Sequence, residues 1–84
     1  MHFDLVWTNR AKKDLRLLDR ETALRVIKRL EELCGKEVVF LEKVKGQEFF
    51  KQRIGSYRIF IEKLKYSRKL VILNLKHRRN AYKF

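Results

Sequence analysis

A strand, turn and strand signal in the middle of the chain constrains the fold most strongly. Apolar and basic residues interleave from Phe49 to Ile54, Gly55-Ser56 supplies a two-residue turn signal, and a second alternating run follows. Because the side chains of a β-strand point alternately to the two faces of a sheet, Lys51 and Arg53 share one face. The sequence therefore predicts a β-hairpin with two cations on the same side, a pattern that also fits a solubilising edge strand.

The residues before this hairpin predict one strand and two helices. Apolar alternation over residues 3–7 indicates a short strand. Helical spacing then predicts a first helix from Asn9 to about Leu18, capped by Thr8 or Asn9, and a second helix between a cap at Asp19 and Gly35. The apolar stripe expected on the second helix consists of Ala23, Ile27, Leu30 and Cys34, widened by Leu24 and Leu33.

The residues after the helices predict three strands. Residues 41–46 form a link into the hairpin, whose second strand runs from Tyr57 to Leu64, and a last strand runs from Lys69 to about Lys76. The apolar run from Leu70 to Leu75 leaves little room for polar contacts, so this strand is expected in the centre of the sheet. The element order predicts an α+β fold with a helix hairpin on a sheet, and residues 1–84 suffice for a single domain.

Composition favours a folded protein without a membrane segment. Apolar residues make up 45% and charged residues 38% of the sequence, as in ordinary folded proteins. No apolar run approaches the roughly 18 residues that a membrane span needs. Asp4, Asn9 and Arg10 interrupt the N-terminus where a signal peptide would be apolar. We therefore expect a cytoplasmic protein that does not bind membranes.

Positive charge is concentrated in the second half of the chain. Residues 1–48 contain 11 Lys and Arg against 9 Asp and Glu, a net charge of +2. Residues 49–84 contain 11 against Glu62 alone, a net charge of +10. Such a density of cations favours a polyanionic partner. Nucleic acid or an acidic protein fits better than a membrane surface, because the basic half has the alternation of β-strands and not the pattern of a basic amphipathic helix.

Several classes of chemistry find no support in the sequence. The single cysteine, Cys34, excludes an intramolecular disulfide and lacks the companions of a metal site, so it is expected as a small buried residue and not as a nucleophile. Paired carboxylates are missing from the basic half, and neither Ser56 nor Ser67 lies in a nucleophile elbow. No metal or small-molecule cofactor is predicted.

The basic half suits the cleavage of RNA by its own 2′-hydroxyl. This reaction removes a proton from the 2′-hydroxyl, places extra negative charge on the phosphorus centre and protonates the departing 5′-oxygen. Arginines bind phosphate oxygens with a planar fork of hydrogen-bond donors. Histidine, present in the basic half as His77, is the residue type whose unperturbed pKa suits proton transfer near neutral pH. Tyr82 is suited to stacking on a base. Each residue alone also fits a solvated charge or, for Tyr82, a packing residue.

Three motifs together resemble the RelE/ParE toxin superfamily, and specifically its RelE branch. They are Lys-Val-Lys-Gly at residues 43–46, Arg-x-Gly-x-Tyr-Arg at residues 53–58, and His-Arg-Arg-x-x-Tyr at residues 77–82. The resemblance spans nearly the whole chain. It implies a small four-stranded, mainly antiparallel sheet packed by the two N-terminal helices. It also implies a ribosome-dependent endonuclease that cuts mRNA in the ribosomal A site and is neutralised by a RelB-type antitoxin.

The resemblance also implies roles for individual residues. Arg58 would hold the scissile phosphate, His77 or Arg79 would protonate the leaving oxygen, and Tyr82 would stack on the mRNA base. The proton acceptor is left open between Lys51 and His77, or the chemistry is mostly electrostatic, because Arg53 replaces a lysine of the family and hardly deprotonates. The implied catalytic set is Lys51, Arg53, Arg58, His77, Arg79 and Tyr82, with further substrate contacts from Lys43, Lys45, Lys76 and Arg78.

Two other functions are compatible with the sequence. ParE-type members share the fold and inhibit DNA gyrase by binding it, without the cationic catalytic set. A basic RNA-binding module without catalysis is the third possibility. For either toxin, we expect an acidic, largely disordered antitoxin that folds over the basic face.

Overall fold

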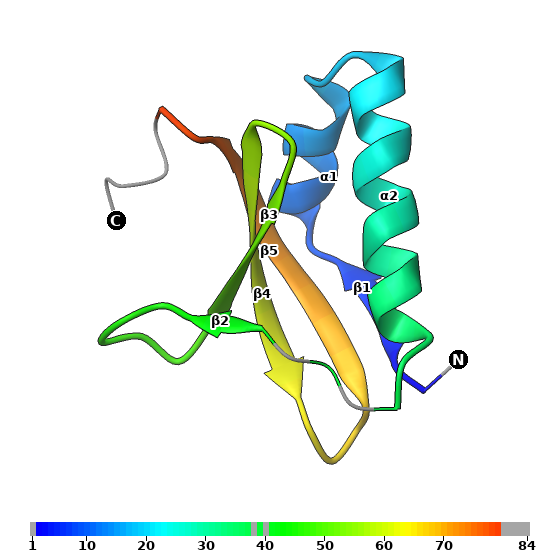
Figure 1. The fold of residues 1–84 in the computed structure, drawn as a ribbon, viewed down its shortest axis with the longest axis vertical. Coiled ribbons are helices and arrows are strands. Elements are labelled where there is room, and N and C mark those ends of the chain that lie inside the picture. The colour runs from blue at the N-terminus through cyan, green and yellow to red at the C-terminus, as the bar shows by residue number, and fades with distance from the viewer. Residues whose placement is uncertain (1, 38, 40, 80–84) are drawn as a thin grey trace.

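The computed structural model describes residues 2–37, 39 and 41–79, which form two helices and a five-stranded sheet. Figure 1 shows both helices on one side of the sheet. The elements in chain order are β1 (Asp4–Trp7), α1 (Asn9–Arg16), α2 (Arg20–Cys34), β2 (Glu42–Lys43), β3 (Phe50–Ile54), β4 (Tyr57–Leu64) and β5 (Lys69–His77). Among the described residues, no helix is long and apolar enough to cross a bilayer.

The strands are ordered β1-β5-β4-β3-β2 across the sheet, so β5 lies inside it, as its apolar sequence predicts. β1 pairs with β5 in parallel, and the other neighbouring strands pair antiparallel. The predicted α+β class and two-helix layer are confirmed. The predicted number of four strands is wrong, because two residues of the expected linker form the edge strand β2. In β2, Glu42 lies opposite Lys51, a cross-strand pair of opposite charge that favours pairing.

Both helices begin at capping side chains. The Thr8 hydroxyl accepts a hydrogen bond from the Ala11 backbone N–H at 3.1 Å and lies 2.8 Å from the Ile72 carbonyl oxygen, to which it can donate, so it ties the start of α1 to β5. Asp19 caps α2 as predicted, accepting from the Thr22 backbone N–H at 3.2 Å. Of the two caps considered for α1, Thr8 is the one used, and the helix ends at Arg16, earlier than expected.

The core lies between the helices and one face of the sheet. Its buried residues are Phe3, Ala11, Val26, Leu30, Cys34, Val39, Ile54, Ile59, Ile61, Leu70, Ile72 and Leu75. On α2 the fully buried stripe is Val26, Leu30 and Cys34, a set spaced by four residues. The buried stripe is rotated around the helix axis from the predicted one, so that Val26 is buried and Leu24 is 55% exposed. Burial raises the pKa of the Cys34 thiol, with smaller contributions from Asp4 and Glu31, as expected for a small core residue.

In the described part of the chain, no helix covers the other face of the sheet, and we call it the open face (Figure 1). Alternation from the buried Ile54 and Ile59 places Arg53 and Arg58 on this open face. It contains one fully buried aromatic residue, Phe60, which packs edge-to-face with Phe49 at a ring-centroid distance of 5.9 Å. The open face is therefore part aromatic and part cationic.

Candidate functional site

A cationic pocket lies on the open face of the sheet. It has a volume of about 110 Å³ and is lined by Glu42, Lys51, Arg53 and Arg58, which come from β2, β3 and β4. Three adjacent strands therefore supply its walls, and side-chain alternation brings residues distant in sequence to one place. A pocket of this size and charge is suited to a single anionic group such as a phosphate.

Strand pairing concentrates the charges around this pocket. Arg53 lies directly opposite Arg58, and Arg58 lies directly opposite Lys76 on β5, so one row across three strands carries three cations. Like charges that face each other across a sheet are destabilising. The pocket is thus an arrangement that packing alone does not require, and an anion bound there would relieve the repulsion.

One wall of the pocket is an acidic residue, Glu42, which is not among the site residues predicted from the sequence. The Glu42 carboxylate lies 3.4 Å from the Lys51 ammonium, and the Glu42 side chain is 72% exposed whereas that of Lys51 is 29% exposed. Among the described residues, no ion pair connects Arg53 or Arg58 to a carboxylate. The sequence predicts a linker at Glu42, because a strand of two residues is too short to show alternation. Its opposite charge to Lys51 was the available signal.

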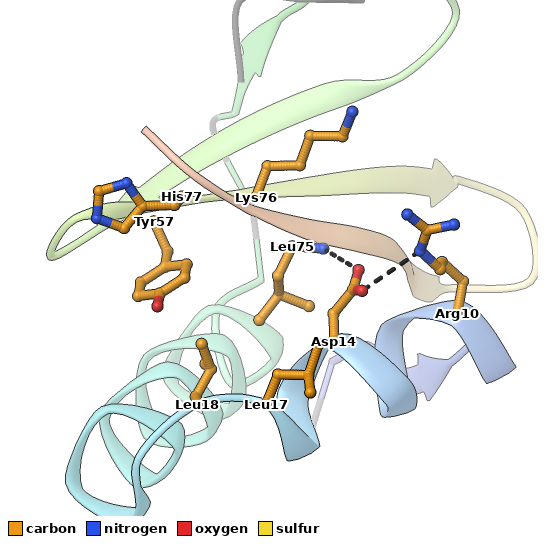
Figure 2. Close-up of a pocket in the computed structure, with 8 residues that line it drawn as sticks. All are labelled: Arg10, Asp14, Leu17, Leu18, Tyr57, Leu75, Lys76 and His77. Carbon is orange, nitrogen blue, oxygen red and sulfur yellow. Dashed lines mark hydrogen bonds and ion pairs between the residues drawn. The ribbon is translucent and has the colours of Figure 1, made fainter. Parts of the chain in front are cut away.

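His77 lies on the helix-covered face of the sheet, opposite to the cationic pocket. It pairs across the strands with Tyr57, and the two rings meet edge-to-face at a centroid distance of 5.3 Å. The preceding residue, Lys76, points to the open face; Figure 2 shows its side chain on the other side of β5 from Leu75. The resemblance implies one catalytic set that contains both His77 and Lys51, which requires the two side chains to lie on one face of the sheet. The structure puts them on opposite faces, because adjacent strand residues alternate and Lys76 lies on the face of Lys51.

Tyr57 and His77 belong to a second pocket, of about 330 Å³, between β5 and the end of α1 (Figure 2). Asp14 lines it and accepts a hydrogen bond from the Leu75 backbone N–H at 3.0 Å, beyond the point where β1 stops covering the edge of β5. The same carboxylate lies 3.3 Å from the Arg10 side-chain Nε. Asp14 thus completes the hydrogen bonding of the β5 edge at this pocket. The other lining residues are Leu17, Leu18 and Lys76.

Arg78 and Arg79, the two described residues that follow β5, are exposed. The Arg78 backbone N–H donates to the Ser56 carbonyl at 2.7 Å, which closes the sheet against the β3–β4 turn. The Arg79 backbone N–H donates to the His77 Nδ1 atom at 3.3 Å, which favours the ring tautomer with its proton on Nε2. The predicted stacking residue Tyr82 lies outside the described residues.

The two lysines predicted to contact substrate before β3 do not line the cationic pocket. Lys43 lies opposite Phe50, so it shares the face of Phe50 and not that of Lys51. Lys45 is exposed in the loop between β2 and β3. No group of three or more His, Cys, Asp or Glu side chains suited to a metal ion occurs in the described part of the chain.

The sequence matches a family whose description is the ParE toxin of the type II toxin–antitoxin system, parDE, over residues 5–82. No curated protein matches it closely enough to count as a relative. Several solved structures have the same fold. The chain resembles the free E. coli toxin RelE carrying two arginine substitutions, with a TM-score of 0.79 and 19% identity, covering 98% of this chain and 90% of that one.

Two toxin–antitoxin complexes are similar. The intact E. coli RelBE complex gives a TM-score of 0.76 at 19% identity, covering 89% of this chain and 95% of that one. The RelB–RelE complex from Methanococcus jannaschii gives a TM-score of 0.75 at 21% identity, covering 94% of this chain and 96% of that one. Sequence identities this low show that the fold is shared, and they do not show a shared activity or target. Because the family match spans residues 5–82 of the 84, the chain belongs to the ParE toxin family of type II toxin–antitoxin systems, within the RelE/ParE superfamily.

Proposed function

We propose that this toxin is a ribosome-dependent endoribonuclease of the RelE type, which acts in the cytoplasm and stops translation by cutting mRNA in the ribosomal A site. The observation that carries the proposal is the pocket formed by Lys51, Arg53, Arg58 and Glu42 on the open face. It combines phosphate-binding cations with groups that can exchange protons. A toxin that acts only by binding a protein target has no need of this combination.

Arg53 and Arg58 would hold the scissile phosphate. Their side chains come from directly opposed positions of β3 and β4, so two guanidinium forks converge on one place. When the 2′-oxygen attacks phosphorus, the new O–P bond forms and the bond to the 5′-oxygen breaks, with extra negative charge on the phosphoryl oxygens in between. Donors held in position beforehand stabilise that charge without reorganising.

Two groups in the pocket can accept the 2′-hydroxyl proton. One is Lys51, once its ammonium has lost a proton, and the other is the Glu42 carboxylate 3.4 Å away. His77 lies on the opposite face of the sheet, so Lys76, beside Arg58, is better located to give a proton to the departing 5′-oxygen. Phosphate or substrate contacts from Arg79, Arg78, Lys45 and Lys43, and base stacking by Tyr82, stay predictions of the sequence.

An acidic antitoxin of the RelB type is the proposed partner. Two of the similar structures are complexes of a RelE toxin with RelB. A protein with a net charge of +12, whose cationic face is not covered by any described helix, would attract an acidic, disordered chain and associate with it rapidly. Competition between the antitoxin encoded beside the toxin and the ribosome, measured by co-sedimentation, checks this expectation.

Toeprinting on translating ribosomes tests the nuclease proposal. Wild-type protein is expected to give cleavage within the A-site codon, and Arg58→Ala to reduce the cleavage rate by about 100-fold or more, the usual cost of losing one transition-state donor. Arg16→Ala, which removes an exposed arginine on α1, is the matched control and should cleave normally. Stalled translation without cut mRNA, or undiminished cleavage by Arg58→Ala, would disprove the proposal.

Inhibition of DNA gyrase is the second candidate, favoured by the description of the matching family as ParE toxins. A supercoiling assay with purified gyrase separates the two candidates. Loss of supercoiling at toxin concentrations that leave mRNA intact would favour the ParE function. In that case Arg58→Ala should affect gyrase no more than Arg16→Ala does.

A further inference from the structure

A second cluster of arginines lies beside the cationic pocket, at the β3–β4 turn. A pocket of about 280 Å³ is lined by Arg25, Arg29, Arg53, Ile54 and Gly55. Arg53 lines this pocket and the cationic pocket as well. The two cavities thus share one lining side chain, and positive charge continues from the open face around the hairpin to α2.

The positions of Arg25 and Arg29 are unfavourable for the helix by itself. They are four residues apart on α2, so their side chains are neighbours, and like charges at this spacing cost about 0.2–0.5 kcal/mol. Glu21 and Glu32 lie at helical spacing from them, yet among the described residues neither arginine forms an ion pair. Two arginines without counter-ions therefore lie beside a third.

The hairpin turn allows this close approach. Gly55 has a positive φ of 59°, and a Cβ atom built on it would lie 3.5 Å from Nη1 of Arg25. The Arg25 guanidinium therefore lies next to the turn, on the side where a residue other than glycine would carry its Cβ atom. The packing of α2 against β3 brings the exposed side chains of Arg25 and Arg29 to this end of the hairpin.

We propose that Arg25 and Arg29, together with Arg53, form a second phosphate-binding subsite that holds the RNA backbone next to the cationic pocket. The inference rests on the proposed function, since it continues the path of the strand that is cut. A phosphodiester chain carries an anion at every nucleotide, so it can fill two adjacent cationic pockets at once. Arginine forks match phosphate oxygens in pairs, and the contact requires no particular base.

Binding of a short RNA that cannot be cut tests this subsite separately from catalysis. The probe is a single-stranded oligoribonucleotide with 2′-O-methyl groups at every position, titrated by fluorescence anisotropy over a range of salt. Arg25→Gln/Arg29→Gln is compared with Lys12→Gln/Arg16→Gln, which removes the same charge at the same spacing from exposed positions of α1. Urea unfolding establishes that both double variants are folded.

The α2 variant is expected to weaken binding about tenfold and to reduce the slope of log K against log salt by about 1.4, because each phosphate contact on a single strand contributes about 0.7. The α1 variant should lower the binding affinity and the salt slope much less. Equal losses in the two variants, no loss in the α2 variant, or no binding by wild type would overturn the subsite. A loss of antitoxin affinity without a loss of RNA affinity would also overturn it.

Toeprinting distinguishes failure of this subsite from failure of the proposed function. If the subsite is correct, Arg25→Gln/Arg29→Gln cleaves more slowly at low ribosome concentration but reaches the wild-type rate at saturation. If wild type binds the methylated RNA through Arg25 and Arg29 but cuts no mRNA, the nuclease proposal fails and the binding subsite stands. If wild type cuts and the α2 variant matches it in binding and cleavage, only the subsite fails.

Discussion

The two faces of the sheet use the same alternating strands for opposite purposes. Under the helices, Ile59, Leu70 and Ile72 are fully buried, and no buried side-chain polar atom in the described part of the chain lacks a partner. On the open face, Arg53, Arg58 and Lys76 stand opposite one another in a row. One face is arranged for stability, and the other holds charges that repel each other.

This difference assigns stability and function to different residues of the same strand. On β5, Ile72 belongs to the core, whereas Lys76 belongs to the cationic row. Like charges kept close together at a cost to folding are typical of sites that bind a charged ligand. Substitutions on the two faces should therefore separate the free energy of unfolding from the cleavage rate.

The largest effect is expected for a core residue. Ile72→Ala should lower the free energy of unfolding by about 2–5 kcal/mol, because it leaves a cavity in the centre of the sheet. Val71→Ala, next to it on the half-buried side, should cost clearly less. Urea unfolding measures both, and cleavage per folded molecule should stay unchanged. Equal costs for the two variants would contradict the division between the faces.

Two adjacent residues at the end of β5 sharpen the comparison. Lys76→Gln should slow A-site cleavage about tenfold, equal to about 1.4 kcal/mol in the activation barrier, because it removes a cation beside Arg58. His77→Gln should slow it less than twofold, because its ring lies against Tyr57 under the sheet. Single-turnover cleavage rates on ribosomes give both numbers. The reverse order would show that His77 reaches the substrate after all.

Much of the fold could be predicted from the sequence. Helix caps, the turn glycine and strand alternation are local signals, and they located the two helices, the hairpin and the apolar β5. Two features depended on contacts between distant segments. β2 exists only because Glu42 and Lys43 pair with β3, and the buried stripe of α2 depends on how the helix is rotated against the sheet.

The site was harder to predict, and for a geometric reason. Alternation within one strand correctly puts Lys51 and Arg53 on one face, since both lie on β3. Assigning His77 to that face required the register between β4 and β5, and a shift of one residue exchanges the faces. The observed register pairs His77 with Tyr57 and Lys76 with Arg58. The sequence of α2 gives no sign of a site at Arg25 and Arg29, because their approach to the hairpin is a tertiary contact.

A smaller effect is expected where α1 is joined to β5. Thr8→Ala should cost about 1 kcal/mol of unfolding free energy, since it removes the cap of α1. Its contact with the Ile72 carbonyl at 2.8 Å is lost as well. Thr8→Ser keeps the hydroxyl and should recover most of the loss in urea unfolding. If serine and alanine are equally destabilising, the methyl group and not the hydrogen bonds is responsible.

The smallest effect concerns a charge that stabilises the helix layer, in contrast to those of the open face. Hydrogen bonds from the side chain and then the backbone of Thr22 lower the pKa of the Asp19 carboxyl. A carboxyl with a lowered folded pKa stabilises the protein above its unfolded pKa of about 3.9, and the contribution disappears as the pH falls through the folded value. Asp19→Asn keeps a capping oxygen but does not titrate. The difference in urea midpoint between wild type and Asp19→Asn should therefore be constant from pH 7 to about pH 5 and shift against wild type below about pH 4. A constant difference throughout would show that the carboxylate charge adds nothing to the cap.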